Sequence, residues 1–145
     1  METKTTTQKI DGRKSPMLSF LQKQGVDFSA KEHKSYKLTA SGFMDLTVET
    51  WREFEGILSI SVAHYGKQNG DLMTDPEIVI FKHENSSQEI PVYYKNDYIG
   101  LEQIGYDFKD GQLLVKKRLV KDLKAFLKTW ASNLTFQGHK MEVIA

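Results

Sequence analysis

A chain of 145 residues can form one domain that buries a sizeable core, so it needs no disulfide bond or metal ion in order to fold. It has no cysteine, which excludes disulfides, thiolate metal sites and cysteine nucleophiles, and which leads us to expect a cytoplasmic protein in a reducing compartment. Its 20 Lys and Arg residues balance 19 Asp and Glu residues, so any attraction to nucleic acid or to an anionic membrane must be local.

The beginning of the chain is polar and rich in threonine. It contains neither the run of about 7–15 apolar residues of a signal peptide nor the longer run of a membrane anchor. We therefore expect a disordered lead-in over residues 1–14 and a single domain over residues 15–145. Ser15 and Pro16 are typical of a helix start and Gly25 of a helix end, which predicts a short helix between them.

The middle of the chain is dominated by strand signals. Apolar and polar residues alternate with the period of two that half-buried strands require, and turn residues such as Ser41-Gly42 separate the segments. Asp110-Gly111 predicts a two-residue hairpin turn that joins 106–108 to 113–115. The other predicted strands are 36–40, 45–49, 57–65, 77–81, 90–95 and 99–108.

The last part of the chain returns to helical spacing. Large apolar residues recur every three or four positions from Leu119 to Leu134, and Gly138 offers a stop. Strands in the middle with helices at both ends predict an α+β fold. We expect an antiparallel meander sheet of about five to six strands, with the short N-terminal helix and the long amphipathic C-terminal helix packed on one face.

One polar segment stands between two of the strongest strands. It contains Asn69-Gly70, a pair that favours positive φ, and Asp75-Pro76, which biases Asp75 toward an extended backbone. We predict a long loop over residues 66–76, and loops that a rigid sheet holds in place often carry binding residues.

This segment also carries a family resemblance. His64-Tyr65, the Gln-Asn-Gly-Asp run at 68–71 and the Asp-Pro-Glu run at 75–77 resemble an uncharacterised family of domains from bacterial plasmids, integrative elements and phages. The resemblance covers residues 17–104 and leaves the C-terminal helix outside. It implies a mobile-element context and, because the family has no assigned activity, it implies no catalytic residue.

The candidate site residues surround the predicted loop and the strand end that follows. Alternation points His64 inward, and we favour a structural histidine with a backbone or carboxylate partner, because an unpaired buried imidazole costs roughly 1–3 kcal/mol. Asp71 and Asp75 are the nearest carboxylates in sequence. The predicted binding residues are His64, Tyr65, Asn69, Asp71, Asp75, Glu77, Tyr94, Asn96 and Asp97.

The C-terminal helix carries a second candidate surface. Its segment 116–128 holds six basic residues and one acidic residue, Asp122. The lysines at helical spacing are Lys117, Lys121, Lys124 and Lys128. They predict a positive stripe, which is either a solvated face or a patch for phosphate groups or an acidic partner.

The sequence predicts a small non-enzymatic accessory or binding protein of a mobile element. It would use the 66–76 loop, the segment 93–97 or the Lys-rich helix to engage a protein or a nucleic acid, but not a membrane. The alternative is a hydrolase-like enzyme with His64 as general base beside Asp71 and Asp75. The sequence has no nucleophile elbow, phosphate loop or dinucleotide fingerprint, which disfavours an enzyme. Asp71, Asp75 and Glu77 lack calcium-loop spacing, so we predict neither a metal nor a cofactor.

Overall fold

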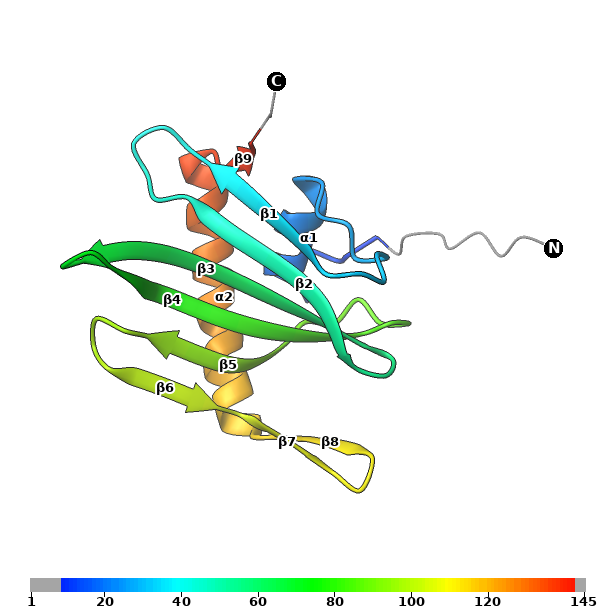
Figure 1. Cartoon of the computed structure of the whole chain (residues 1–145). Coiled ribbons are helices and arrows are strands. Elements are labelled where there is room, and N and C mark those ends of the chain that lie inside the picture. Colours follow the sequence, from blue (N-terminus) through cyan, green and yellow to red (C-terminus); the bar gives the residue numbers. More distant parts are fainter. Residues whose placement is uncertain (1–8, 143–145) are drawn as a thin grey trace.

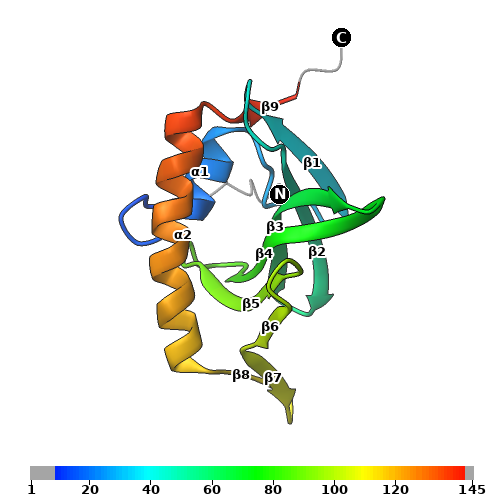
Figure 2. The same cartoon turned by 90° about the vertical axis from the view of Figure 1, so that its left-hand side faces the viewer.

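A computed structural model describes residues 9–142, which form one antiparallel sheet of seven strands, a separate two-stranded hairpin and two helices. Figure 1 looks onto the open face of the sheet, and Figure 2 shows from the side that both helices cover the opposite face. In chain order the elements are α1 (Pro16–Lys23), β1 (Lys34–Thr39), β2 (Leu46–Phe54), β3 (Ile57–Gln68), β4 (Asp71–His83), β5 (Ile90–Asn96), β6 (Leu101–Ile104), β7 (Tyr106–Lys109), β8 (Gln112–Val115), α2 (Lys117–Gln137) and β9 (Lys140–Met141).

The sheet confirms the predicted α+β class and the meander topology. Its strand order is β6-β5-β4-β3-β2-β1-β9, so each strand from β1 to β6 lies beside its neighbour in sequence. The predicted number of five to six strands is wrong, because the chain returns after α2 and adds the short β9 beside β1. A strand of two residues has too little alternation to be seen in a sequence.

The predicted strand 99–108 is also broken. Gly105 divides it, donating its N–H to the Val92 carbonyl (2.7 Å) and accepting from the Lys116 N–H (2.8 Å). A side chain does not fit there, because a Cβ on Gly105 would lie 2.7 Å from Cδ2 of Leu119. The chain therefore leaves the main sheet at Gly105 and forms the β7–β8 hairpin, whose turn residues Asp110 and Gly111 have the expected positive φ.

Both predicted helices are present, but the first is capped from elsewhere. Ser15 makes no side-chain cap; its hydroxyl accepts the Glu89 N–H (3.0 Å). The carboxylate of Glu89 accepts the Leu18 N–H (3.0 Å) and so takes the capping role. α2 ends as predicted at Gly138, which is left-handed with φ 81°. Neither helix is long and apolar enough to cross a membrane.

The core lies between the sheet and the two helices. Alternate residues of the central strands point toward the helices, and one stripe of each helix faces them. Ile10 joins this core, and its N–H donates to the side chain of Gln22 (2.9 Å). The rest of the expected lead-in falls largely on residues 1–8, which lie outside the described residues. The fully buried core side chains include Met17, Leu21, Leu38, Leu46, Ile60, Ile78, Ile80, Leu127 and Leu134.

The predicted loop 66–76 is wrong. β3 and β4 continue through it as a long hairpin, in which Gln68 faces Asp71. Only Asn69 and Gly70 form the turn, with φ 53° and 85°. A two-residue turn with positive φ at both positions matches the twist of antiparallel strands, so the ladder continues almost to the tip.

Candidate functional site

The open face of the sheet has a hollow centre that follows from the size of its side chains. The centre of β3 places three small residues on this face, Ser59, Ser61 and Ala63, between the larger Ile57 and Tyr65. Its neighbours β2 and β4 carry larger ones, so that Ser59 lies between Trp51 and Phe81 in one cross-strand row. Small residues flanked by large ones produce a depression along β3.

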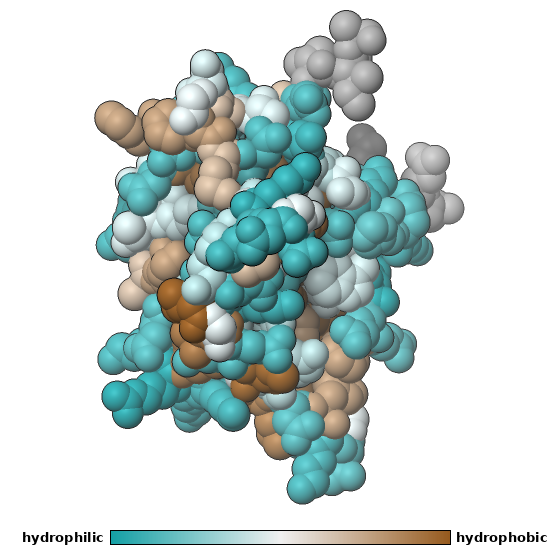
Figure 3. Space-filling model, turned by 60° about the vertical axis from the view of Figure 1, so that its left-hand side comes forward, coloured by the Kyte–Doolittle hydropathy of each residue, from teal (hydrophilic) through white to brown (hydrophobic). Residues whose placement is uncertain are grey.

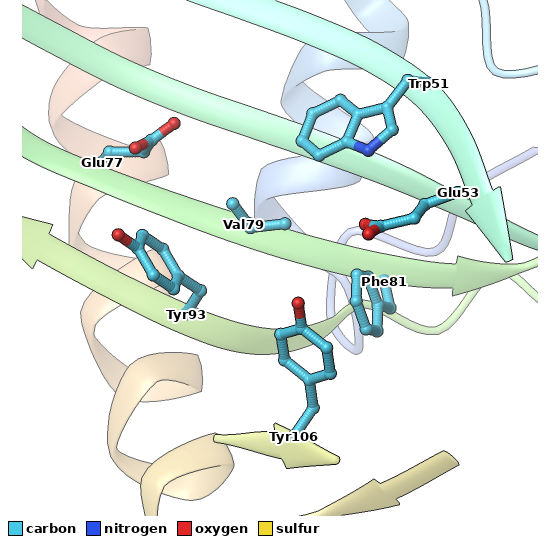
Figure 4. A pocket seen from close by; sticks show the side chains of 7 residues that line it. All are labelled: Trp51, Glu53, Glu77, Val79, Phe81, Tyr93 and Tyr106. Carbon is cyan, nitrogen blue, oxygen red and sulfur yellow. The ribbon is translucent and has the colours of Figure 1, made fainter. Parts of the chain in front are cut away.

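This depression holds a pocket of about 250 Å³. Figure 4 shows that its side chains come from β2, β4 and β5 and that Tyr106 of the β7–β8 hairpin closes one side, with its hydroxyl pointing into the space. The residues that line the pocket are Trp51, Glu53, Glu77, Val79, Phe81, Tyr93 and Tyr106.

An aromatic cluster fixes the wall that Tyr106 forms. The ring of Tyr106 packs edge-on against Phe81, with 4.9 Å between ring centroids, and against Phe54 at 6.3 Å. Phe54 stacks on Phe108 of the same hairpin at 4.6 Å and 6°. Such pairs contribute about 0.5–1.5 kcal/mol each beyond the area that they bury. The hairpin is therefore held against the sheet at the side of the pocket.

The pocket is electrostatically negative. Its only charged lining residues are the carboxylates Glu53 and Glu77, and Glu77 accepts a hydrogen bond from the Ser61 hydroxyl (2.6 Å). Burial, followed by the charge of Glu53, raises the pKa of Tyr106. Burial also raises the pKa of Tyr93, whose hydroxyl donates to Glu102. The phenols therefore stay neutral at physiological pH, while the carboxylates supply negative charge.

An unpaired polar group lies in β3, between the strands that line the pocket. The hydroxyl of Ser59 is buried, and no residue in the described part of the chain hydrogen-bonds to it. Buried polar groups usually have a partner, so this hydroxyl is an exception, but it does not line the pocket.

His64 lies on the other face, half-buried at the edge of the core. Its Nε2 accepts the indole N–H of Trp130 (3.2 Å), so Nδ1 carries the proton and donates to the Asp45 carbonyl (2.9 Å). Burial lowers the pKa of His64, which outweighs the backbone bond to Asp45 and the charge of Asp75. The partner of this histidine is thus a backbone carbonyl rather than a carboxylate.

The structure brings only some of the predicted site residues together. Asn96 donates to Asp75 (3.4 Å), and the carboxylate of Asp97 accepts the Thr74 N–H (2.8 Å). The backbone bond at Thr74 lowers the pKa of Asp97. Tyr94 faces the helices and packs edge-on against Phe126. These contacts tie the end of β5 to β4.

Asn69 and Asp71 lie apart from this group, at the hairpin tip. Within residues 9–142 no hydrogen bond or ion pair joins Asp71 to His64, and no three acidic or histidine side chains gather as metal ligands do. Apolar side chains are exposed at Leu72 in this hairpin, by 63%, and at Ile99 in the turn between β5 and β6, by 66%. Figure 3 brings this end of the molecule forward and shows hydrophobic side chains scattered among hydrophilic ones.

The pocket contains only one residue of the predicted site, Glu77, while Tyr65 shares the open face and has its pKa raised by burial and by Glu77. Sequence reasoning missed the others because a pocket between strands depends on register. Their alternate positions in β2, β4 and β5 carry a signal, but it becomes visible only once the strands are paired. Tyr93 begins the predicted segment 93–97, and the residues missed are Trp51, Glu53, Val79, Phe81 and Tyr106.

The predicted basic stripe is present on α2. Lys117, Lys121 and Lys128 are exposed, and Lys124 is half-buried. The apolar stripe of the helix faces the core, with Trp130 only 7% exposed. Figure 2 shows that α2, the helix that carries these lysines, covers the face of the sheet opposite to the open face that holds the pocket.

Comparison with known proteins identifies a family but no function. No curated protein and no solved structure matches the chain. One family model matches residues 17–140, well past residue 104, where the resemblance was expected to end, so the basic helix lies inside the family domain. With most of its length covered by that model, the chain belongs to DUF6908, a family of domains of unknown function.

Proposed function

We propose that the chain is a small non-enzymatic binding module of a bacterial mobile element, whose open-face pocket binds a Lys or Arg side chain of a protein partner. The observation that carries the proposal is the pocket lining, which combines four aromatic rings with two carboxylates and includes no basic residue. Aromatic faces attract cations, and carboxylates form charge-assisted hydrogen bonds with them.

The size of the pocket supports a side chain rather than a cofactor. Its volume of about 250 Å³ is below the roughly 300–1,000 Å³ of clefts that enclose drug-sized ligands. The sequence also predicted a macromolecular partner, but it placed the contact at residues 66–76, whereas we propose the open-face pocket. The mobile-element context rests on the resemblance carried by His64-Tyr65 and residues 68–77.

The hydrolase-like alternative gains no support from the geometry. Both ring nitrogens of His64 are engaged, by Trp130 and by the Asp45 carbonyl, so neither is free to take a proton from water. Asp71 stands at the hairpin tip rather than beside the ring.

The proposal is tested with a matched pair of small ligands. N-acetyl-arginine amide carries a guanidinium, and N-acetyl-citrulline amide has nearly the same shape without the charge. We expect the arginine compound to change the fluorescence of Trp51 in a saturable way and the citrulline compound to do so far more weakly. Trp51→Phe should remove the signal, which separates it from that of Trp130.

Variants of the two carboxylates complete the test. Glu53→Gln and Glu77→Gln should each weaken binding roughly two- to fivefold, as for a partly exposed ion pair. Glu55→Gln, at an exposed residue outside the lining, is the control and should bind like the wild type. Equal binding of both ligands, or no effect of either pocket variant, would reject the proposal.

A further inference from the structure

The net charge of +1 conceals an uneven distribution of charge, because the pocket lining is acidic and α2 is basic. The open face carries acidic residues around the pocket and on the strands beside it, together with the basic residues Lys37 and Lys95. The helix side carries basic ones. The acidic residues are Glu49, Glu53, Glu77 and Glu102, and the exposed basic residues of the helix side include Arg13, Lys14, Lys23, Lys117, Arg118, Lys121 and Lys128.

The lysines of α2 form a regular row. Lys117, Lys121, Lys124 and Lys128 follow each other at intervals of four, three and four residues, which places neighbours about 5–6 Å apart in a row about 16 Å long. Asp122 is the only acidic residue of α2, and as the neighbour of Lys121 it lies roughly 100° around the helix axis. Within the described chain none of the four lysines forms an ion pair.

The basic row continues onto the segment before α1. The charge of Lys124 acts on Glu89, whose carboxylate caps the start of α1 at Leu18. Lys124 therefore lies near the start of α1, and the exposed Arg13 and Lys14 come just before it in the chain. Figure 2 shows the segment before α1 projecting from the helix side, away from the sheet.

We propose that this basic face, made of Lys117, Lys121, Lys124, Lys128, Arg13 and Lys14, binds the phosphate backbone of double-stranded nucleic acid without reading its sequence. A row of unpaired, evenly spaced cations matches the evenly spaced charges of a duplex, and neutralising them releases counterions. The inference does not rest on the pocket, which lies on the opposite face.

Two other polyanionic partners fit the face less well. Proteins that bind single strands use aromatic rings on which bases stack, and no aromatic residue interrupts the lysine row. A helix that lies on a membrane inserts an apolar face, whereas the apolar face of α2, with Leu123, Leu127 and Leu134, is buried in the core.

The test measures binding of the full chain to a labelled 20-base-pair DNA duplex by fluorescence anisotropy, at salt concentrations from 50 to 200 mM. We expect binding that weakens steeply with salt. The variant Lys121→Glu/Lys128→Glu should bind at least roughly tenfold more weakly at 50 mM salt. Its log–log salt slope should fall by about 1.8, because each lost phosphate contact removes about 0.9.

The matched control has the same net charge. Lys67→Glu/Lys109→Glu changes two exposed lysines near the tips of the β3–β4 and β7–β8 hairpins, and it should bind the duplex nearly as well as the wild type. Four outcomes would overturn the proposal. The first two are no duplex binding at 50 mM salt and equal losses of affinity in the two variants. The other two are binding only to vesicles containing 30% phosphatidylserine and tighter binding of a single strand of equal length.

Discussion

His64 shows how a polar residue becomes part of a core. Alternation along β3 directs it toward the helices, where its ring joins Trp130 to the backbone at Asp45. The arrangement requires the neutral imidazole, because a proton on Nε2 would face the N–H of Trp130. A folded-state pKa below the ordinary value follows from this burial.

The sign of the pH dependence follows from that shift. A base with a lowered folded-state pKa contributes stability that is fully present above its unfolded pKa of about 6.5 and is lost as pH falls through the folded value. His64→Gln can keep both hydrogen bonds without titrating. We expect its unfolding free energy, measured in urea, to fall less between pH 7 and 5 than that of the wild type, by up to about 1.4 kcal/mol per pH unit.

The control for His64 is Asp71, one of the two carboxylates nearest to it in sequence. Asp71→Asn should leave both this pH dependence and the NMR titration of His64 unchanged, because Asp71 lies at the hairpin tip. A pH dependence of His64→Gln equal to that of the wild type would show that the imidazole is not desolvated as described.

The contribution of Glu89 to stability has the opposite pH dependence, because it is lost as pH rises. Burial raises the pKa of this carboxyl to about 7 from 4.5, despite the hydrogen bonds from the start of α1. Its stabilising contribution is therefore complete below pH 4.5 and is lost as pH rises through 7. Glu89→Gln should gain on the order of 3 kcal/mol relative to the wild type between pH 4.5 and 8. Urea unfolding at both pH values measures this gain, and the exposed Glu55→Gln should show none.

At the scale of elements, the sequence predicted the turns and the helix end that depend only on neighbouring residues. Asn69-Gly70 and Asp110-Gly111 are turns because both pairs tolerate positive φ, and Gly138 ends α2 for the same reason. The cap of α1 could not be predicted, because it comes from Glu89, which is 71 residues from Leu18 in sequence. The closeness of Leu119 to Gly105, where the predicted strand breaks, is likewise visible only in the fold.

Gly105 allows a direct test of that break. Gly105→Ala would place a Cβ 2.7 Å from Leu119 Cδ2 and 3.1 Å from the Val92 carbonyl oxygen, and we expect it to destabilise the fold by roughly 1–3 kcal/mol. Leu119→Ala removes the nearer clash, so Gly105→Ala should cost less in that background. A double-mutant cycle of unfolding free energies measures the difference. Strict additivity would mean that Leu119 does not confine the turn.

At the scale of the molecule, the pocket escaped sequence reasoning because it belongs to no single segment. It forms where the small Ser59 and Ser61 of β3 lie between the larger residues of β2 and β4, which requires the register of three strands. The lysine stripe of α2 was predictable because one helix contains it. The net charge of +1 indicated neither surface, because the positive and negative charges of the chain nearly cancel.

The separation of these surfaces predicts that they act independently. The pocket lies on the open face of the sheet and the lysine row lies on α2, which covers the other face, and charges at 0.15 M salt are screened within about 8 Å. Glu77→Gln should therefore leave duplex affinity unchanged within about twofold, and Lys121→Glu/Lys128→Glu should leave the affinity for N-acetyl-arginine amide equally unchanged. Fluorescence titration of the arginine compound into protein saturated with duplex checks this, and the affinity should match that of free protein. Competition between the two ligands at 0.15 M salt would show that they share one surface, and would contradict the assignment of the cation to the open face and of the duplex to the helix face.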